Sequence, residues 1–559
     1  MGKYSDAHIC QCLNQLLTSR RNLPVTITNG QPKTGEQFVH EVVSLAYGLR
    51  EIGVKAGDVV AISAYNSDLY LGWLLAIAFV GGIASPLNYR WSIKEAILAI
   101  TSVRPVMLVI DESSYTWFIN LQKKDIPSLR WHVFLGSSSS DFIKKWNLLT
   151  PELLKKHLTK LPPFRYSWAP EGAVIICFTS GTTGKPKGVT LSHAALIIQS
   201  LAKIAIVGYC EDDIYLHTAP LCHIGGLSSA MAMLMVGSCH VLMSKFDAQS
   251  AVDAIEQYTV TSLITVPAIM ADMVLVIRGK ETWNGGESVK KILNGGGSLS
   301  NELIMYSSIF FPKAKLISAY GMTETCSSLT FLTLYDSTYE KIGQSFQTAA
   351  NRRSDTMKYS QGVCVGKVAP HVELSIYSDA SGHVGRILTR GPHVMLRYWD
   401  QTPTCPLDPS NDVWLDTGDI GSIDHNGNLW LLGRTNGLIK SGGENIYPEE
   451  VEEILLEHSG IAGVVIVGIP DVRLTEMVVA CIQTSKDWQW SEQSVSEDHH
   501  LSPGNLRQYC MKKNLSRFKI PKVFILWRKP FPLTTSGKIR RDQLRKELMY
   551  QLHSLQSNI

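Results

Sequence analysis

A glycine- and threonine-rich segment at residues 179–189 carries the strongest chemical signal in the sequence. It follows an apolar run and precedes a helical pattern. Its glycines let the backbone bend and point N–H groups at anionic oxygens, while its hydroxyls and lysines add donors and positive charge. A flexible linker would not need two lysines flanking a proline, so a phosphate-binding loop is predicted. The residues with this role are Thr179, Ser180, Gly181, Thr182, Thr183, Gly184, Lys185 and Lys187.

This loop is not a Walker A loop, because Pro186 follows Lys185 where that loop has Ser or Thr. It resembles the signature loop of the AMP-binding superfamily, which includes acyl-CoA synthetases, firefly luciferase and non-ribosomal adenylation domains. The resemblance implies that the loop binds ATP. It also implies a later glycine segment on the adenine side, which Gly295, Gly296 and Gly297 match, although these three alone would also suit a plain turn.

A second motif lies at residues 320–324, where Tyr320, Gly321, Thr323 and Glu324 are similar to the superfamily's Y-G-x-T-E sequence. The resemblance implies that Tyr320 stacks on adenine, that Thr323 bonds the α-phosphate and that Glu324 holds Mg²⁺. A hard cation takes carboxylate oxygen and offsets the repulsion between phosphates. Outside this motif, Glu324 would be interpreted as a solvated surface acid.

Three more residues match later motifs in the expected order. The resemblance implies that Asp419, in a T-G-D sequence, accepts hydrogen bonds from both ribose hydroxyls. It implies that Arg434 reaches ribose or phosphate with its guanidinium fork. Lys538, in a P-x-T-x-x-G-K sequence, is implied to neutralise the substrate carboxylate and the α-phosphate during catalysis.

The resemblance implies a two-step reaction that uses ATP, Mg²⁺ and CoA. A carboxylate attacks the α-phosphorus of ATP and pyrophosphate leaves; a thiol then attacks the acyl-adenylate and AMP leaves. Superfamily members rotate the C-terminal domain between the steps, so Lys538 withdraws. Lys440 and residues 441–445 are expected to face the thiol in the second state. The hinge is expected just after Arg434, with the pivot residue left open because Asn436 replaces the usual Asp or Lys.

The acyl pocket is expected beside residues 220–227, which resemble the superfamily's P-L-x-H segment. His223 is predicted to line the carboxylate or gate the thiol tunnel, with a satisfied core histidine as the alternative. Gly225 and Ser229 are small and leave room for a bulky or aromatic acyl group. Ser298 is predicted to line the same pocket.

Within the superfamily, residues 199–206, 223–235 and 391–393 are most similar to the plant 2-succinylbenzoate–CoA ligases of phylloquinone synthesis. This resemblance implies 2-succinylbenzoate as the acid, and the chloroplast or peroxisome as the location. Ala232 stands where some bacterial relatives carry an arginine for the aromatic carboxylate, so no partner for that carboxylate is predicted. The alternatives are a 4-coumarate-like or medium-chain acid–CoA ligase, transfer to a carrier-protein thiol, and an inactive homologue that binds nucleotide or acid.

The elements that must position these residues alternate between apolar runs and amphipathic stretches, which favours an α/β fold with parallel sheets. A composition change predicts a large domain at residues 1–433 and a small α+β domain at residues 434–559. The resemblance implies two parallel-rich sheets and a β-barrel in the first domain, and mobility of the second. The predicted buried strands are residues 59–62, 105–110, 173–178 and 263–266, and predicted helices include residues 40–50 and 193–206.

Composition excludes several other classes of protein. The chain has 559 residues, of which 45% are hydrophobic and 18% charged, an ordinary globular composition. A net charge of +4 over this length predicts no nucleic-acid partner. The longest apolar run, residues 71–87, is broken by glycine and proline, so it predicts a buried helix followed by a strand and no transmembrane segment. Scattered cysteines and a polar N-terminus indicate a soluble protein in a reducing compartment, and no oligomeric state is predicted.

Overall fold

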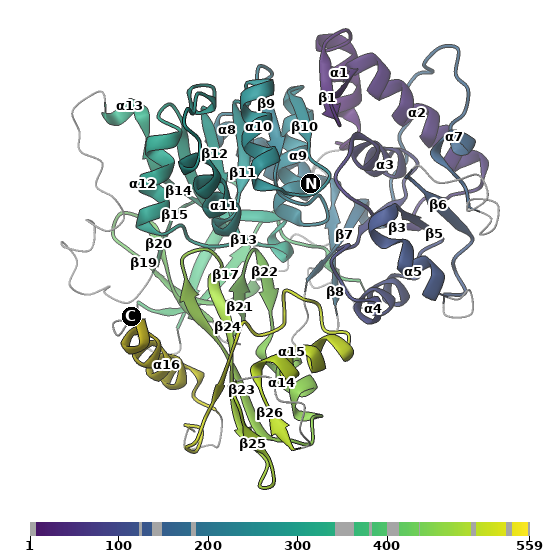
Figure 1. The fold of residues 1–559 in the computed structure, drawn as a ribbon. Coiled ribbons are helices and arrows are strands. Elements are labelled where there is room, and N and C mark those ends of the chain that lie inside the picture. Colours follow the sequence, from purple (N-terminus) through teal and green to yellow (C-terminus); the bar gives the residue numbers. More distant parts are fainter. Residues whose placement is uncertain are drawn as a thin grey trace.

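The computed structural model of the chain has a large N-terminal part of sheets and helices, and a smaller C-terminal part below it (Figure 1). The structure describes residues 7–121, 126–136, 148–179, 186–340, 363–378, 383–399, 413–434, 437–492, 499–532 and 539–556. Several predicted site residues fall outside these ranges. They are Ser180, Gly181, Thr182, Thr183, Gly184, Lys185 and Lys538, together with the expected pivot Asn436.

One sheet of the N-terminal part has seven strands in the order β18-β8-β7-β4-β3-β5-β6. Strands β3 to β7 pair in parallel, and β8 and β18 add antiparallel partners at one edge. The parallel strands are apolar runs, as expected for a sheet covered by helices on both faces. The strands predicted at residues 59–62, 105–110 and 173–178 are confirmed. Their bounds are β3 (Val59–Ser63), β4 (Ile83–Pro86), β5 (Met107–Ile110), β6 (Trp131–Phe134), β7 (Ala173–Thr179), β8 (Lys187–Ser192) and β18 (Arg397–Tyr398).

A second sheet has thirteen strands, from β16 at one edge to β2 at the other. Strands β1 and β9 to β13 pair in parallel, while β14 to β17, β19 and β20 pair antiparallel and continue the sheet where the resemblance implies a barrel. The two parallel-rich sheets are therefore confirmed. The bounds are β1 (Pro24–Thr28), β2 (Gln31–Thr34), β9 (Ile214–His217), β10 (Cys239–Leu242), β11 (Ser262–Thr265), β12 (Lys291–Asn294), β13 (Lys315–Met322), β14 (Ser327–Asp336), β15 (Val363–Val368), β16 (Glu373–Tyr377), β17 (Gly385–Arg390), β19 (Leu415–Ile423) and β20 (Asn428–Arg434).

Several helices begin at residues whose side chains accept hydrogen bonds from the first backbone N–H groups. Thr34 and Gln37 form a capping box at the start of α2, and Ser192 caps α8. Residues 71–87 form the predicted buried helix and strand, α3 followed by β4, and no described helix combines the length and apolarity needed to cross a bilayer. The bounds are α1 (Gln11–Ser19), α2 (Gly35–Glu51), α3 (Asp68–Phe79), α4 (Ile93–Val103), α5 (Tyr115–Asn120), α7 (Pro151–Leu154), α8 (His193–Val207), α9 (Ile224–Val236), α10 (Ala248–Tyr258), α11 (Pro267–Arg278), α12 (Asn301–Phe310) and α13 (Ser337–Glu340).

Residues 437–556, here called the C-terminal unit, are built on a five-stranded sheet with hydrophobic cores on its two faces. The hairpin of β21 and β22 projects from this sheet toward the N-terminal part (Figure 1). The bounds are β21 (Ile439–Ser441), β22 (Glu444–Ile446), α14 (Pro448–Leu456), β23 (Ile461–Asp471), β24 (Thr475–Thr484), β25 (Gln489–Trp490), β26 (His500–Leu501), α15 (Pro503–Lys512), β27 (Val523–Leu526) and α16 (Arg541–Gln556).

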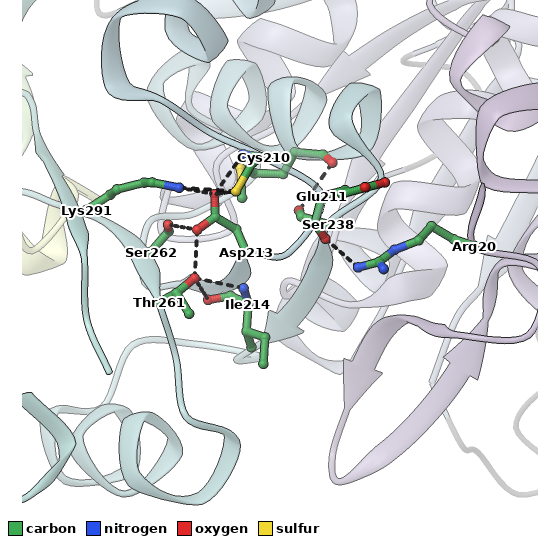
Figure 2. A network of polar contacts seen from close by, with 10 residues as sticks. Arg20, Cys210, Glu211, Asp213, Ile214, Ser238, Thr261, Ser262 and Lys291 are labelled. Atoms are coloured by element: carbon green, nitrogen blue, oxygen red, sulfur yellow. Dashed lines mark hydrogen bonds and ion pairs between the residues drawn. The ribbon is translucent and has the colours of Figure 1, made fainter. Parts of the chain in front are cut away.

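The amino ends of the parallel strands β9, β11 and β12 meet in one closed polar network (Figure 2). Asp213 precedes β9, and its carboxylate accepts hydrogen bonds from Thr261 and Ser262 at 2.7 Å. Lys291 Nζ lies 2.7 Å from Asp213 Oδ2. Burial of Asp213 would raise its pKa, but the bond from Lys291 and the hydroxyl donors hold that pKa below its usual value. This network ties three strands together within the N-terminal part.

Candidate active site

A cavity of about 580 Å³ lies where the carboxyl ends of the parallel strands face the C-terminal unit. The strand-end residues Pro86, Thr265 and Asn294 line it, as expected for ligand sites in α/β sheets. The β21–β22 hairpin supplies another wall. The predicted site residues that line the cavity are Thr179, His223, Gly225, Gly295, Gly296, Gly321, Thr323, Glu324 and Lys440.

The two ends of the predicted phosphate loop lie side by side. Thr179 ends β7, Lys187 begins β8, and the two residues are opposite each other in the antiparallel register. The helix predicted after this segment is confirmed as α8, and a strand that was not predicted, β8, lies before it. Lys187 Nζ lies 5.3 Å from the centre of the Tyr398 ring, and the Tyr398 hydroxyl bonds to Glu324. The positive charge of Lys187 therefore lies close to a carboxylate that lines the cavity.

Tyr320 and Asp419 are in direct contact, although the sequence analysis gave them separate roles. Tyr320, at the end of β13, donates a hydrogen bond of 2.6 Å to Asp419 Oδ2, on β19. Both side chains are buried, and Lys440 Nζ lies 5.9 Å from the centre of the Tyr320 ring. The backbone of Arg434 lies opposite Asp419 in the register of β19 and β20, and its side chain lies outside the described part.

Glu324 is buried in a short helical turn at residues 323–325. Tyr398 donates a hydrogen bond of 3.0 Å to Glu324 Oε1. Burial raises the pKa of Tyr398 far above its usual value, and the charge of Glu324 raises it further, so this phenol stays a proton donor. One cavity-lining carboxylate suits Mg²⁺, which in proteins commonly uses one or two carboxylates together with substrate phosphates. The described residues contain no group of three or more His, Cys, Asp or Glu side chains that would form an all-protein metal site.

The C-terminal unit also comes close to the glycine segment after β12. Gly296 has φ of +70°, and a Cβ placed on it would lie 3.5 Å from the Cα of Gly443 in the hairpin turn. A Cβ placed on Gly297 would lie 2.3 Å from Thr475 Oγ1, well inside van der Waals contact. These glycines therefore let a neighbouring backbone come close, whichever group occupies the space beside them.

Four polar residues join the hairpin to the N-terminal part. Glu444, in β22, forms an ion pair with Arg90 and lies 3.2 Å from His223 Nε2. Asn88 Nδ2 donates a hydrogen bond of 3.2 Å to the same Glu444 oxygen. Burial alone would raise the pKa of Glu444, but His223 and Arg90 hold it far below its usual value. The cluster of Asn88, Arg90, His223 and Glu444 is here called the hairpin clamp.

A second ion cluster joins the two parts beside the hairpin clamp. Lys519 Nζ, from the C-terminal unit, lies 2.5 Å from Glu95 Oε1 and 2.7 Å from Glu450 Oε1. Glu95 belongs to α4 of the N-terminal part, and all three side chains are buried. Burial raises the pKa of Glu450, whereas Lys519 outweighs burial at Glu95 and lowers that pKa. The two carboxylates therefore share one ammonium group across the boundary.

The part of the cavity where the sequence predicts the acyl group is lined by residues of α8 and α9. His223 precedes α9, and Gly225 lines the cavity as predicted. Ser229 is buried behind the wall, where it accepts a 3.2 Å hydrogen bond from Lys203 on α8, so its predicted contact with substrate is not seen in the described cavity. Ser298 is exposed on the loop after β12 and is likewise absent from that lining.

Sequence reasoning missed Asn88, Arg90, Lys203, Glu95 and Lys519. One signal for the first two was available, because they follow β4 at its carboxyl end, where ligand-facing residues are expected. The remaining three depend on partners distant along the chain, such as Glu95 and Lys519, which are 424 residues apart.

The chain belongs to the AMP-binding enzyme family: residues 16–399 match the family itself, and residues 450–538 match its C-terminal domain. It is 53% identical to the chloroplastic/peroxisomal 2-succinylbenzoate–CoA ligase of Arabidopsis thaliana, over 100% of both chains. It is also 32% identical to an indoleacetate–CoA ligase of Aromatoleum aromaticum, over 91% of this chain and 92% of that protein.

Among solved structures, the chain is similar to o-succinylbenzoate CoA synthetase of Bacillus subtilis in two different complexes. A double mutant of that enzyme bound to the product analogue OSB-NCoA gives a TM-score of 0.71 at 25% identity, over 96% of this chain and 98% of that one. The complex with the acyl-adenylate OSB-AMP gives 0.61 at 25% identity, over 96% and 97%. The two complexes therefore differ in their TM-score to this chain, although the sequence identity is the same.

Proposed function

We propose that this chain is an ATP-dependent acid–CoA ligase that converts 2-succinylbenzoate to 2-succinylbenzoyl-CoA through an acyl-adenylate. The observation that carries the proposal is the 53% identity to the Arabidopsis ligase over the full length of both chains. The predicted motif residues on β7, β13 and the loop after β12 line one cavity, which supports the same conclusion. The corresponding pathway would be phylloquinone synthesis, and the name of the relative supports the chloroplast and peroxisome as locations.

In the first half-reaction, the reacting carboxylate must approach a triphosphate that repels it, so catalysis depends on positioning and charge neutralisation. Thr179, Lys187 and the loop between them would bind the phosphates. Tyr320 and Asp419 would hold adenosine, Asp419 through the ribose hydroxyls. Lys538 would neutralise charge at the α-phosphorus.

The fit of Glu324 supports a role for Mg²⁺ in the same step. Its carboxylate would hold the ion, with Thr323 beside it on the α-phosphate, while Tyr398 orients the carboxylate through its hydrogen bond. When bound, the ion supplies positive charge to the phosphate oxygens. Removal of Glu324 should therefore weaken adenylation without changing the affinity for CoA.

The second half-reaction would use the arrangement seen in the structure. The β21–β22 hairpin lies against Gly296, and the hairpin clamp holds Lys440 and Glu444 at the cavity. The larger TM-score to the complex with a CoA-product analogue than to the acyl-adenylate complex supports this assignment. Lys440 and His223 would then border the path of the thiol, and the chain would hinge after Arg434, between domains 1–433 and 434–559.

The decisive experiment measures pyrophosphate release with a panel of acids, with and without CoA. We expect 2-succinylbenzoate to give the highest kcat/KM, and Lys538→Ala to reduce the acid-dependent signal by about 10³-fold or more. Lys529→Ala is a matched control, because Lys529 is exposed and lies outside the cavity. Unchanged turnover in Lys538→Ala would remove that lysine from the mechanism.

The same panel separates the alternatives. If 4-coumarate or a medium-chain acid gives the highest kcat/KM, the proposed substrate is wrong but the proposed reaction stands. Pyrophosphate release with every acid, but no thioester with free CoA, would indicate a carrier-protein thiol as acceptor. Nucleotide binding without pyrophosphate release would indicate an inactive homologue and overturn the proposal.

A further inference from the structure

Lys203, on α8, is a buried lysine whose ammonium group has only hydroxyl partners among the described residues. Its Nζ donates hydrogen bonds to Ser228 Oγ at 2.5 Å, Ser229 Oγ at 3.2 Å and Ser327 Oγ at 3.2 Å. The side chain is 1% exposed, yet it lines the cavity. A buried ammonium without a counter-charge is costly, so such a group needs either a special function or an anion.

Two other lysines, one partly buried and one buried, show what Lys203 lacks. Lys291 meets Asp213, and Lys519 meets Glu95 and Glu450. Those two pairings are complete within the protein. The α9 residues that face Lys203 contain no acid, because Ile224–Val236 consists of small and apolar residues with two serines. Among the described residues, the hydrogen-bond partners of Lys203 are three serine hydroxyls, so a bound anion could supply the counter-charge.

One hydroxyl partner of Lys203, that of Ser327, lies on a strained segment of backbone. Cys326 has φ of +54° and Ser327 has φ of +111°, two successive residues in a region that side chains rarely adopt. Ser327 lines the cavity and begins β14, directly after the turn that carries Glu324. Strain of this kind persists where the surroundings impose it, and it gathers at ligand sites. Here it holds a hydroxyl between Lys203 and the cavity.

We propose that Lys203, with the hydroxyl of Ser327, binds the second, ring-attached carboxylate of a dianionic aromatic acid. This inference rests on the proposed function and names the group that selects the acid. The reacting carboxylate would face Thr323 and the loop that binds the phosphates, while the other carboxylate meets Lys203 on α8. An acid with a single carboxylate would leave the lysine without its counter-ion.

The protonation behaviour of Lys203 agrees with this geometry. Burial lowers the pKa of Lys203 to about 7, so a carboxylate that arrives beside it restores the charged form. The Ser327 hydroxyl can turn to donate to the carboxylate while still accepting from the ammonium. Above pH 7, recognition of the second carboxylate is therefore coupled to proton uptake by Lys203.

The test compares two acids that differ by one group: 2-succinylbenzoate, and 4-oxo-4-phenylbutanoate, which lacks the ring carboxylate. In Lys203→Met, we expect kcat/KM for 2-succinylbenzoate to fall about 100-fold, as for loss of one partner of a buried charge pair. For 4-oxo-4-phenylbutanoate it should change less than about threefold, since no second carboxylate has to be paired. An equal fall for both acids would overturn the proposal.

Further variants keep the outcome decisive. Lys203→Arg should recover part of the preference for 2-succinylbenzoate. Lys291→Met removes a partly buried lysine at the amino end of β12, away from the cavity, and should leave the ratio between the acids unchanged. If Lys203→Met does not fold, Ser327→Ala is measured with the same two acids, and an unchanged ratio would overturn the proposal. A wild-type enzyme without activity on 2-succinylbenzoate would instead overturn the proposed function.

Discussion

The two ends of the parallel strands in the N-terminal part carry charged groups whose partners are of different kinds. At the amino ends, Asp213 and Lys291 neutralise each other within one part of the chain, and neighbouring hydroxyls complete the network (Figure 2). At the carboxyl ends, Glu444 finds its partners only across the boundary between the two parts, and Lys203 finds no carboxylate among the described residues. Charges that complete each other locally stabilise the fold, whereas charges that depend on a second lobe or on a ligand report function.

The comparison is sharpest for stability at the amino ends. Asp213→Ala leaves the Lys291 ammonium partly buried without its carboxylate and removes the acceptor for Thr261 and Ser262. We expect the free energy of unfolding to fall by about 3–5 kcal/mol, as for other buried pairs that lose one member. Urea denaturation measures this loss. The kcat/KM of the fraction that remains folded should be near wild type, and a changed acid preference would contradict the division between the two ends.

Glu444→Gln tests the hairpin clamp at the carboxyl ends. It keeps the size of the side chain but removes the charge that pairs with Arg90. We expect the thioester-forming step to slow about 30- to 100-fold, the cost of a lost buried charge interaction, while adenylation changes little. Single-turnover measurements with and without CoA separate the two steps. Glu457→Gln, at an exposed pair with Lys513, is the control and should have no measurable effect. If both steps slow equally, the hairpin clamp does not act specifically in the domain arrangement that forms the thioester.

The pH dependence of acid choice tests Lys203. Its pKa in the folded protein is lowered to about 7, so the ammonium form that binds a second carboxylate is present below pH 7 and lost above it. We expect the ratio of kcat/KM for 2-succinylbenzoate to that for 4-oxo-4-phenylbutanoate to fall about tenfold per pH unit above 7. The facing Cys326 thiol stays neutral there, because burial raises its pKa to about 12. The ratio should be flat in Lys203→Arg; a flat ratio in the wild type would contradict the expectation.

The smallest expected effect concerns the contact between the glycine segment and the C-terminal unit. Gly297→Ala brings a methyl group against Thr475, whose side chain must turn away. We expect the thioester step to slow about fivefold, within the range for mild overpacking. Thr475→Gly in the same chain should restore the rate, because Thr475 has φ of +72° and glycine adopts that conformation without strain. No recovery in the double variant would show that the alanine acts elsewhere, for example on adenine.

Local patterns in the sequence predicted the elements well. The strands β3, β5, β7 and β11 and the helices α2 and α8 lie where apolar periodicity placed them, because each is specified by residues adjacent in the chain. The position of the site also followed, since motif residues at Gly295, Thr323 and Glu324 come directly after strands that end at one sheet edge. The strand β8 was not predicted, because it has only six residues and follows the glycine-rich loop without a break in the pattern.

The sequence did not reveal the partners of the buried charges. Arg90 and Glu444 are 354 residues apart, so only tertiary packing brings them together. Lys203 is the one charged residue in an otherwise largely apolar helix, and such a lysine ordinarily reaches out to solvent with its long stem. Burial and the absence of an acid nearby became evident only when α8, α9 and the strained turn before β14 were placed together.

The groups around Lys203 all come from the N-terminal part, from two helices and one turn. The C-terminal unit, which would rotate between the two chemical steps, contributes none of these contacts. A lineage could therefore exchange one acid for another by substitutions on α8 and α9, without rebuilding the surfaces that deliver lysine or thiol. On this proposal, the residues that select the acid and the residues that drive the two chemical steps lie on separate elements, so the acid preference could change while the catalytic residues stay the same.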